Sequence, residues 1–266
     1  MRPSQIHELL TRHGVRPSKA LGQNFLADEN TARRIVRLAE VQPGDRVVEV
    51  GPGLGSLTVA LVEAGAHVCA IELDRHLVPI LANVVDGLDV EVVEADALRV
   101  DWNEQLGPGP WIMVANLPYN VGTPLVITAL ETAPMINRFL VMVQREVGER
   151  MAAHAGDEAY GAMSVKVAYY ADATIVGTVS PNVFVPKPNV ESVLVRLVRH
   201  DNPPVPVRDV DAMFDLVRAG FATRRKTLRN TLQGRVDAER FARADIDPRA
   251  RAETLALTDW ARLADA

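Results

Sequence analysis

The sequence is poor in several features, and each shortage excludes a class of protein. Cys69 is the only cysteine, so no disulfide can form within the chain, and its apolar neighbours predict a buried side chain. No apolar run reaches the roughly 18 residues of a membrane-spanning helix. Residues 1–10 are polar and lack the apolar segment of a signal peptide. The six histidines are not spaced as metal ligands. We therefore expect a soluble, cytoplasmic protein without a metal.

The length and apolar content are sufficient for a large folded core. The chain has 266 residues, of which 48% are hydrophobic, and this excludes disorder along the whole chain. A chain of this size fits one large domain, or a large domain with a small companion.

The net charge of −5 argues against a nucleic-acid partner at first, but the charges are unevenly distributed. Residues 47–107 contain two basic and eleven acidic side chains, a net charge of −9. Residues 218–235 contain six basic side chains and no acidic one. Because such asymmetry concerns partners rather than fold, a polyanion can still bind to the basic part of the chain.

From about residue 46 the chain alternates between strand and helix patterns. Helices are predicted at residues 56–63 and where apolar side chains recur at helical spacing from Leu77 to Val85. Strands are predicted at residues 46–50, 67–71, 89–93, 111–115, 139–143, 174–179 and 190–198. This alternation predicts an α/β fold with a mostly parallel sheet and helices on both faces. The last strands can pair antiparallel at one edge.

The pattern also predicts two domains. Residues 1–205 form the first domain, which begins with a polar helical leader. The proline-rich run at residues 202–206 predicts a linker, and only helical patterns follow it. We therefore predict a small α-helical domain at residues 206–266.

A glycine-rich turn follows the first predicted strand. Gly51, Gly53 and Gly55 open the next helix, and glycines there allow positive φ and close approach to a ligand. Glu72 ends the second strand, where a carboxylate can accept both ribose hydroxyls, and Asp96 follows the third, where it can bind an adenine amine. Each carboxylate alone could be a helix cap or a solvated loop residue. Together they indicate an adenosine-containing cofactor, either NAD or S-adenosylmethionine.

The turn after the fourth strand, Asn116-Leu117-Pro118-Tyr119, suits methyl transfer to a planar amine. The Asn116 side-chain carbonyl and the Leu117 backbone carbonyl can accept the amine hydrogens, which frees the nitrogen lone pair for a methyl sulfonium. Pro118 stiffens the turn, and Tyr119 offers a ring on which a base can stack. The structural alternative is a β-turn with a buried tyrosine.

This turn resembles the (Asp/Asn/Ser)-Pro-Pro-(Tyr/Phe) signature of S-adenosylmethionine-dependent amino-methyltransferases. Five further motifs occur in the expected order over residues 5–260, and the chain resembles the KsgA-type small-subunit ribosomal RNA adenine dimethyltransferases. These motifs lie at residues 21–26, 48–58, 71–74, 184–188 and 221–232. The resemblance implies a Rossmann-like methyltransferase fold with a seven-stranded sheet and a C-terminal helical domain.

The resemblance also implies roles for single residues. Asn24 and Leu26 would contact S-adenosylmethionine, although Phe25 and Leu26 could instead anchor a helix capped by Asp28. The Gly51–Gly53 loop would bind the methionine end of the cofactor, Glu72 the ribose and Asp96 adenine N6. Asn116 would contact both the cofactor and the target amine.

A second aromatic residue is implied in the base pocket. Phe184 would sandwich the target base with Tyr119, although a phenylalanine at the start of a strand is as often a core residue. This loop departs from the family pattern, since Lys187 replaces a common proline and Asn189 a lysine.

The basic segment, residues 218–235, is predicted to bind RNA. Gly220 would interrupt one helix and Thr223 would cap the next, in which Leu228 and Leu232 form a buried pair. Arginines at positions 225 and 229 would then repel one another, and a polyanion would relieve this repulsion. The alternative is a solvated charged face. The predicted RNA contacts are Arg224, Arg225, Lys226 and Arg229.

We therefore expect an enzyme that dimethylates N6 of two adjacent adenosines near the 3′ end of small-subunit (16S) rRNA, acting as a monomer on the 30S assembly particle. One alternative is the related large-subunit adenine methyltransferase. Another is an assembly factor that uses this fold without catalysis. An NAD-dependent oxidoreductase is a third, although the sequence lacks a hydride-transfer constellation.

Overall fold

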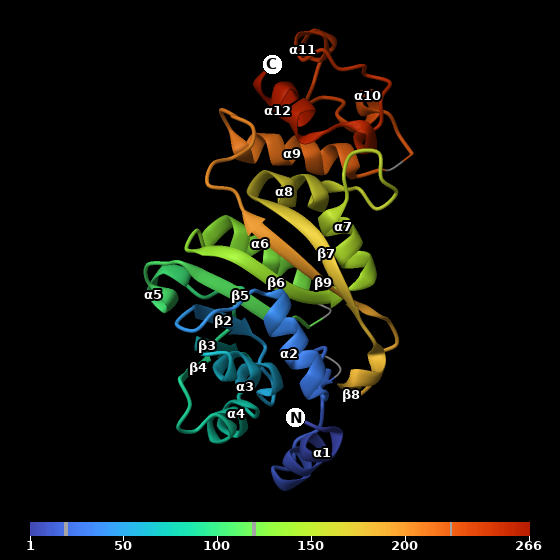
Figure 1. Ribbon diagram of the computed structural model, residues 1–266. Coiled ribbons are helices and arrows are strands. Elements are labelled where there is room, and N and C mark those ends of the chain that lie inside the picture. The colour runs from blue at the N-terminus through green and yellow to red at the C-terminus, as the bar shows by residue number, and fades with distance from the viewer. Residues whose placement is uncertain (19–20, 119–120, 224) are drawn as a thin grey trace. The chain divides into compact units, whose positions relative to one another are not determined.

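The computed structural model describes residues 1–18, 21–118, 121–223 and 225–266 (Figure 1). The chain forms two compact units, one of residues 1–148 with 174–199 and one of residues 149–173 with 200–266. The second unit thus includes a helix from before residue 205. The predicted boundary between a catalytic domain and an RNA-binding domain at residues 205 and 206 stays a prediction.

The first unit alternates strands and helices along most of its length, and α7 and β7 run into the second unit. Its elements are α1 (Pro3–Arg12), β1 (Phe25–Leu26), α2 (Glu29–Leu38), β2 (Arg46–Val50), α3 (Ser56–Glu63), β3 (His67–Glu72), α4 (Val78–Val84), β4 (Val90–Glu94), α5 (Trp102–Leu106), β5 (Trp111–Asn116), α6 (Gly122–Thr132), β6 (Ile136–Gln144), α7 (Arg145–Ala152), β7 (Ala171–Val179), β8 (Phe184–Val185) and β9 (Ser192–Arg199).

Seven of these strands form one sheet in the order β4-β3-β2-β5-β6-β9-β7 (Figure 1). The strands from β4 to β6 are parallel, and β9 is antiparallel to β6. The predicted α/β fold with a mostly parallel seven-stranded sheet is confirmed. Because β2 lies between β3 and β5, the strand order reverses there, and open α/β sheets bind ligands at the carboxyl ends of strands beside such a reversal.

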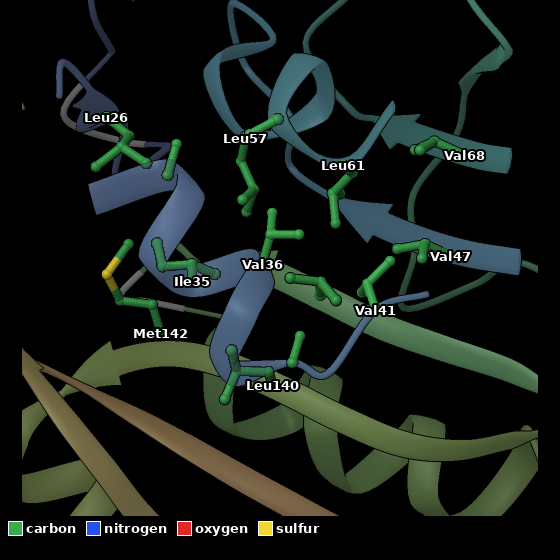
Figure 2. Close-up of a cluster of buried hydrophobic side chains, with 14 of the residues drawn as sticks. Leu26, Ile35, Val36, Val41, Val47, Leu57, Leu61, Val68, Leu140 and Met142 are labelled. Atoms are coloured by element: carbon green, nitrogen blue, oxygen red, sulfur yellow. The ribbon is translucent and has the colours of Figure 1, made fainter. Parts of the chain in front are cut away.

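A buried apolar cluster holds α2 and α3 against the sheet. The cluster joins Ile35 and Val36 of α2 to Leu57 and Leu61 of α3 and to Val47 of β2 (Figure 2). All five side chains are buried because apolar residues recur at helical spacing on the two helices and fill β2.

Two sequence-based expectations for the first unit are confirmed. Asp28 caps α2, since its carboxylate accepts a hydrogen bond from the Thr31 backbone N–H at 2.7 Å. Cys69 lies in β3 with no exposed surface, and burial raises the pKa of its thiol to about 11.

The second unit is helical and has its own apolar core. Its helices are α8 (Ala162–Tyr170), α9 (Val210–Phe221), α10 (Leu228–Thr231), α11 (Ala238–Arg243) and α12 (Leu257–Asp265). Fully buried Trp260 of α12 lies at the centre of this core, together with Phe214 and Val217 of α9. No helix among the described residues is long and apolar enough to cross a membrane.

The predicted helix break at Gly220 lies one residue before the observed end of α9 at Phe221. Gly220 lies inside α9, and its hydrogen faces the indole of Trp260. A β-carbon at this position would collide with Trp260 Cη2, so the glycine allows close packing between α9 and α12.

Gly220→Ala is therefore expected to destabilise the protein by about 2 kcal/mol, because overpacking against a fully buried indole outweighs the better helix propensity of alanine. Urea unfolding would measure this loss. Gly161→Ala is the matched control, since a β-carbon there meets no atom within 4 Å. Equal stability of the two variants would contradict the packing argument.

The prediction of a helix capped by Thr223 is wrong. Helix α10 begins at Leu228 after Thr227, and Thr223 instead lies in a turn in which its carbonyl accepts from the Lys226 N–H at 3.1 Å. Arg225 therefore precedes the helix, and the expected repulsion between arginines on one helix does not arise. The predicted burial of Leu228 and Leu232 is confirmed.

Candidate active site

A cavity lies at the carboxyl ends of β2, β3 and β5, beside the reversal of strand order. It brings together residues that are far apart in the sequence: the segment before α2, the glycine turn, and the residues that follow β3, β4 and β5. The predicted site residues in its wall are Asn24, Leu26, Gly51, Gly53, Glu72, Asp96, Asn116, Leu117 and Pro118.

The glycine turn allows the backbone to form the floor of this cavity. Gly51, Gly53 and Gly55 all have positive φ, between 60° and 85°, which side-chain-bearing residues rarely adopt. A β-carbon on Gly53 would lie 2.9 Å from the ring of Phe25, so the segment before α2 packs directly on this turn. Any larger residue at position 53 would displace Phe25.

Glu72 is a buried carboxyl of the site. Its Oε2 accepts a hydrogen bond from the Gly53 N–H and its Oε1 one from the Asp74 N–H, both at 2.9 Å. Burial raises the pKa of Glu72, and the two backbone hydrogen bonds oppose this rise. Each oxygen can accept a further hydrogen bond, so two neighbouring hydroxyls can still bind.

Asp96 lies two residues beyond the end of β4. Its Oδ1 accepts from the Leu98 N–H at 3.0 Å, and its Oδ2 lies 3.5 Å from the Arg99 guanidinium. The carboxylate is partly exposed at the cavity wall, where it can accept a hydrogen bond from an exocyclic amine.

Asn116 ends β5 and presents its side-chain amide at the cavity. Its Nδ2 donates to the backbone carbonyl of Asn24 at 3.1 Å, which leaves Oδ1 as the acceptor for another group. The next residue, Leu117, is buried and donates its N–H to the Met142 carbonyl at 3.1 Å. The turn is thereby fixed to β6. The predicted stacking residue Tyr119 lies outside the described residues.

Phe184 is not among the described residues that line the cavity. It pairs with Leu26 in the small antiparallel sheet β1–β8, and its side chain is 3% exposed within the core cluster. The structure thus joins Phe184 to the segment that closes the cavity, but its contact with a base stays a prediction.

Three cavity residues carried no role in the sequence-based prediction. Leu73 and Leu98 follow the two predicted adenosine-binding carboxylates, and both are exposed at the cavity wall although they are large and apolar. Such exposure suits the faces of a planar ligand. Their signal was their place one or two residues after an acidic side chain near a strand end.

Glu49 is the third of these residues and is 1% exposed. Its Oε2 accepts from the Thr58 hydroxyl at 2.6 Å, across the turn from β2 to α3. Burial raises the pKa of Glu49 to about 8, the Thr58 hydrogen bond opposes this rise, and the charge of Glu72 adds to it. The folded protein therefore holds the Glu49 proton more tightly than the unfolded chain does. The stability that this adds is fully present below about pH 4.5 and is lost as the pH rises through 8.

Glu49→Gln is expected to remove this loss because the amide cannot ionise. Between pH 5 and 8, the parent's free energy of unfolding should fall relative to the variant's by at most about 1.4 kcal/mol per pH unit. Urea unfolding of the ligand-free proteins at several pH values measures this difference. Parallel pH profiles would show that Glu49 is not the responsible group.

The basic segment lies in the second unit. Arg225, Lys226 and Arg229 are exposed there, and Arg224 lies outside the described residues. The backbone N–H groups of Leu228 and Arg229 donate to the carbonyls of Ala250 and Pro248, both at 2.8 Å, which fixes the start of α10. The side chains of Arg225, Lys226 and Arg229 are therefore exposed to solvent, next to a backbone that these two hydrogen bonds hold in place.

The cavity residues fit S-adenosylmethionine. The glycine turn leaves room for a ligand beside the backbone, and the Ser56 hydroxyl at the start of α3 is buried without a hydrogen-bond partner among the described residues. The Glu72 and Asp96 carboxylates line the same cavity, where they can accept hydrogen bonds from the ribose hydroxyls and the adenine amine of an adenosine. Among the described residues, no cluster of three or more His, Cys, Asp or Glu side chains could hold a metal ion.

Comparisons with known proteins identify the family of this chain. The family model for ribosomal RNA adenine dimethylase matches residues 15–266. Two curated relatives, the ribosomal RNA small subunit methyltransferases A of Thermobifida fusca and Streptomyces griseus, are each 47% identical over 99% of this chain and 94% of their own length.

Two solved structures share the fold over most of their length. A dimethyladenosine transferase from Plasmodium falciparum is 25% identical, with a TM-score of 0.76 over 90% of this chain and 95% of that one. The 23S rRNA methyltransferase ErmE is 27% identical, with a TM-score of 0.70 over 91% and 98%. This chain is therefore a methyltransferase that belongs to the ribosomal RNA adenine dimethylase family.

Proposed function

We propose that this chain transfers methyl groups from S-adenosylmethionine to N6 of two adjacent adenosines near the 3′ end of small-subunit (16S) rRNA, giving N6,N6-dimethyladenosine. The observation that carries this proposal is one cavity in which Glu72 and Asp96 lie in the same wall as the Asn116 amide. The first two residues suit an adenosine, and the third suits an amine that is to be methylated.

The cofactor would be held by residues from three strand ends. Glu72 would accept the ribose hydroxyls, Asp96 would accept adenine N6, and Leu73 and Leu98 would cover the adenine faces. The glycine turn would hold the methionine end, with Asn24 and Leu26 closing the site. Bound S-adenosylmethionine would supply an electrophilic methyl group on a sulfonium, and the C–S bond would break to leave the neutral thioether S-adenosylhomocysteine.

The Asn116 turn would prepare the target amine. The Asn116 Oδ1 and the Leu117 carbonyl would accept hydrogens of N6, so the nitrogen becomes more tetrahedral and its lone pair is available for attack. Because the methylated nitrogen is cationic, it loses its proton readily to water, and no strong base is required. A second transfer needs a pocket that also admits a monomethylated amine.

The target base must leave its stack to reach this cavity. We assign Tyr119 and Phe184 to the two faces of the base, and in this arrangement the buried Phe184 ring would have to become exposed. Arg224, Arg225, Lys226 and Arg229 would contact RNA phosphates. As an enzyme of ribosome assembly it would act in the cytoplasm, as a monomer, on the 30S particle.

Incubation with purified, under-methylated 30S particles and labelled S-adenosylmethionine tests this proposal. We expect label in N6,N6-dimethyladenosine after nuclease digestion, at four methyl groups per RNA. Likeness to ErmE favours one second candidate, the methylation of large-subunit rRNA. Purified 50S particles in parallel distinguish the two, and label confined to 50S particles would overturn the small-subunit assignment.

A further inference from the structure

The segment that closes the cavity is attached at three strand ends. We call residues 21–26 the strap. Its Phe25 ring packs on Gly53 after β2, and its Asn24 carbonyl accepts from Asn116 at the end of β5. The third attachment is a hydrogen bond from Gln23 Nε2 to Asp74 Oδ2 at 2.7 Å, just after β3. The strap thus spans the strands whose ends form the site.

The orientation of the Gln23 amide is fixed by its neighbours. Its Oε1 accepts from the Ser18 N–H at 2.7 Å, and its backbone N–H donates to the Ser18 carbonyl at 3.1 Å. With the oxygen of the amide held by an N–H donor, only the NH₂ group is left to face Asp74. Gln23 is therefore a donor to Asp74 and cannot reverse without losing Ser18.

Asp74 is held on its other sides. Its Oδ1 accepts from the His76 N–H at 3.0 Å, and its own N–H donates to Glu72 Oε1 at 2.9 Å. Glu72 in turn accepts from the Gly53 N–H at 2.9 Å. These contacts close into a ring: Gln23 binds Asp74, Asp74 binds Glu72, Glu72 binds Gly53, and Gly53 packs against Phe25 of the strap. The strap and the ribose carboxylate are consequently parts of one hydrogen-bonded unit.

We propose that the Gln23–Asp74 hydrogen bond is a latch that holds the strap over the cofactor and, through the Asn24 carbonyl, orients the Asn116 amide for the target amine. This inference rests on the proposed function and makes Gln23 and Asp74 positioning residues. Since only an N–H donor can face the Asn24 carbonyl, a fixed strap directs the Asn116 NH₂ group away from the substrate and Oδ1 towards it.

A donor–acceptor exchange tests the latch. In Gln23→Glu, two carboxylates face one another, and the strap loses its third attachment. In the double variant Gln23→Glu/Asp74→Asn, the amide introduced at position 74 can donate to the carboxylate introduced at position 23. The other oxygen of that carboxylate still accepts from the Ser18 N–H. Gln42→Glu is the matched control, because Gln42 is exposed and precedes β2, at the opposite end of the sheet.

The first readout needs no RNA. In Gln23→Glu we expect amide hydrogen exchange of residues 21–26 to increase about tenfold and the Kd for S-adenosylmethionine to rise about tenfold, with an unchanged thermal midpoint. The double variant should return both values to within threefold of the parent, and Gln42→Glu should change neither. Exchange and affinity of Gln23→Glu within twofold of the parent, or no recovery in the double variant, would overturn the latch.

The second readout is the rate of methylation on 30S particles at saturating S-adenosylmethionine. A latch that orients Asn116 predicts a kcat about tenfold lower in Gln23→Glu, with recovery in the double variant. A kcat equal to that of the parent at saturation would limit the pair to cofactor binding and overturn its role in orienting Asn116. If the parent itself does not methylate 30S particles, the proposed function fails, and the exchange and affinity measurements still decide the latch.

Discussion

Asn116→Ala is expected to lower kcat for methylation of 30S particles by roughly 10²–10³-fold, the size of effect seen when one preorganised polar contact to the reacting group is removed. The variant leaves the target amine without its side-chain acceptor and frees the Asn24 carbonyl of its donor. Single-turnover methylation measures the loss, and the S-adenosylmethionine affinity, measured in parallel, separates chemistry from binding.

Two further variants make this result specific. Asn103→Ala, at an exposed position of α5, makes the same change away from the cavity and should leave kcat unaltered. Asn116→Asp retains an acceptor but places a carboxylate against the Asn24 carbonyl, so it should also be impaired. If Asn116→Ala lost methylation and small-subunit assembly together, the role in assembly would depend on catalysis, whereas normal assembly by a variant that cannot methylate would favour the assembly-factor alternative. Normal methylation by Asn116→Ala would remove Asn116 from the reaction.

Glu72→Gln is expected to weaken binding of S-adenosylmethionine by about 10²-fold, since charge-assisted hydrogen bonds to two hydroxyls are lost. The change also has a cost within the protein. Both carboxylate oxygens accept backbone N–H groups, from Gly53 and Asp74, and a glutamine would turn its NH₂ group towards one of these donors. Titration calorimetry with the cofactor gives the Kd.

Glu94→Gln is the matched control for this experiment. Glu94 ends β4 at the same edge of the sheet, in register with Glu72, but its side chain is exposed. The same loss of charge there should change the Kd less than twofold. A similar weakening in both variants would indicate that the total negative charge of this edge attracts the cofactor, and Glu72 would then have no specific contact.

The sheet was predictable because its signals are local. Short β-branched runs such as residues 46–50 are buried on both faces in a parallel sheet, and the chain turns sharply at the glycines that follow. The carboxylates at the ends of β3 and β4 were predictable from the same rule, since parallel strands present their carboxyl ends at one edge. The predicted cavity residues meet there for that reason.

What the sequence could not reveal concerns contacts between distant residues. A glycine within a helix resembles a helix break until its partner is known, and the partner of Gly220 is Trp260, which lies 40 positions later. The role of Glu49 depends on its burial and on the hydroxyl of Thr58, neither of which is visible in a single motif. The burial of Phe184 follows from its pairing with Leu26 across more than 150 residues, a non-local contact that no sequence period reveals.

The burial of the single cysteine has a practical consequence. Since the thiolate is the reactive form of cysteine, a buried thiol with a pKa of about 11 should not react with maleimides at neutral pH in the folded protein. A cysteine introduced at an exposed position, such as Arg225→Cys, would then be the only site that takes up a label. The natural chain can therefore carry a single photocrosslinker or fluorophore without removal of its own thiol, and its RNA neighbours can be mapped one position at a time.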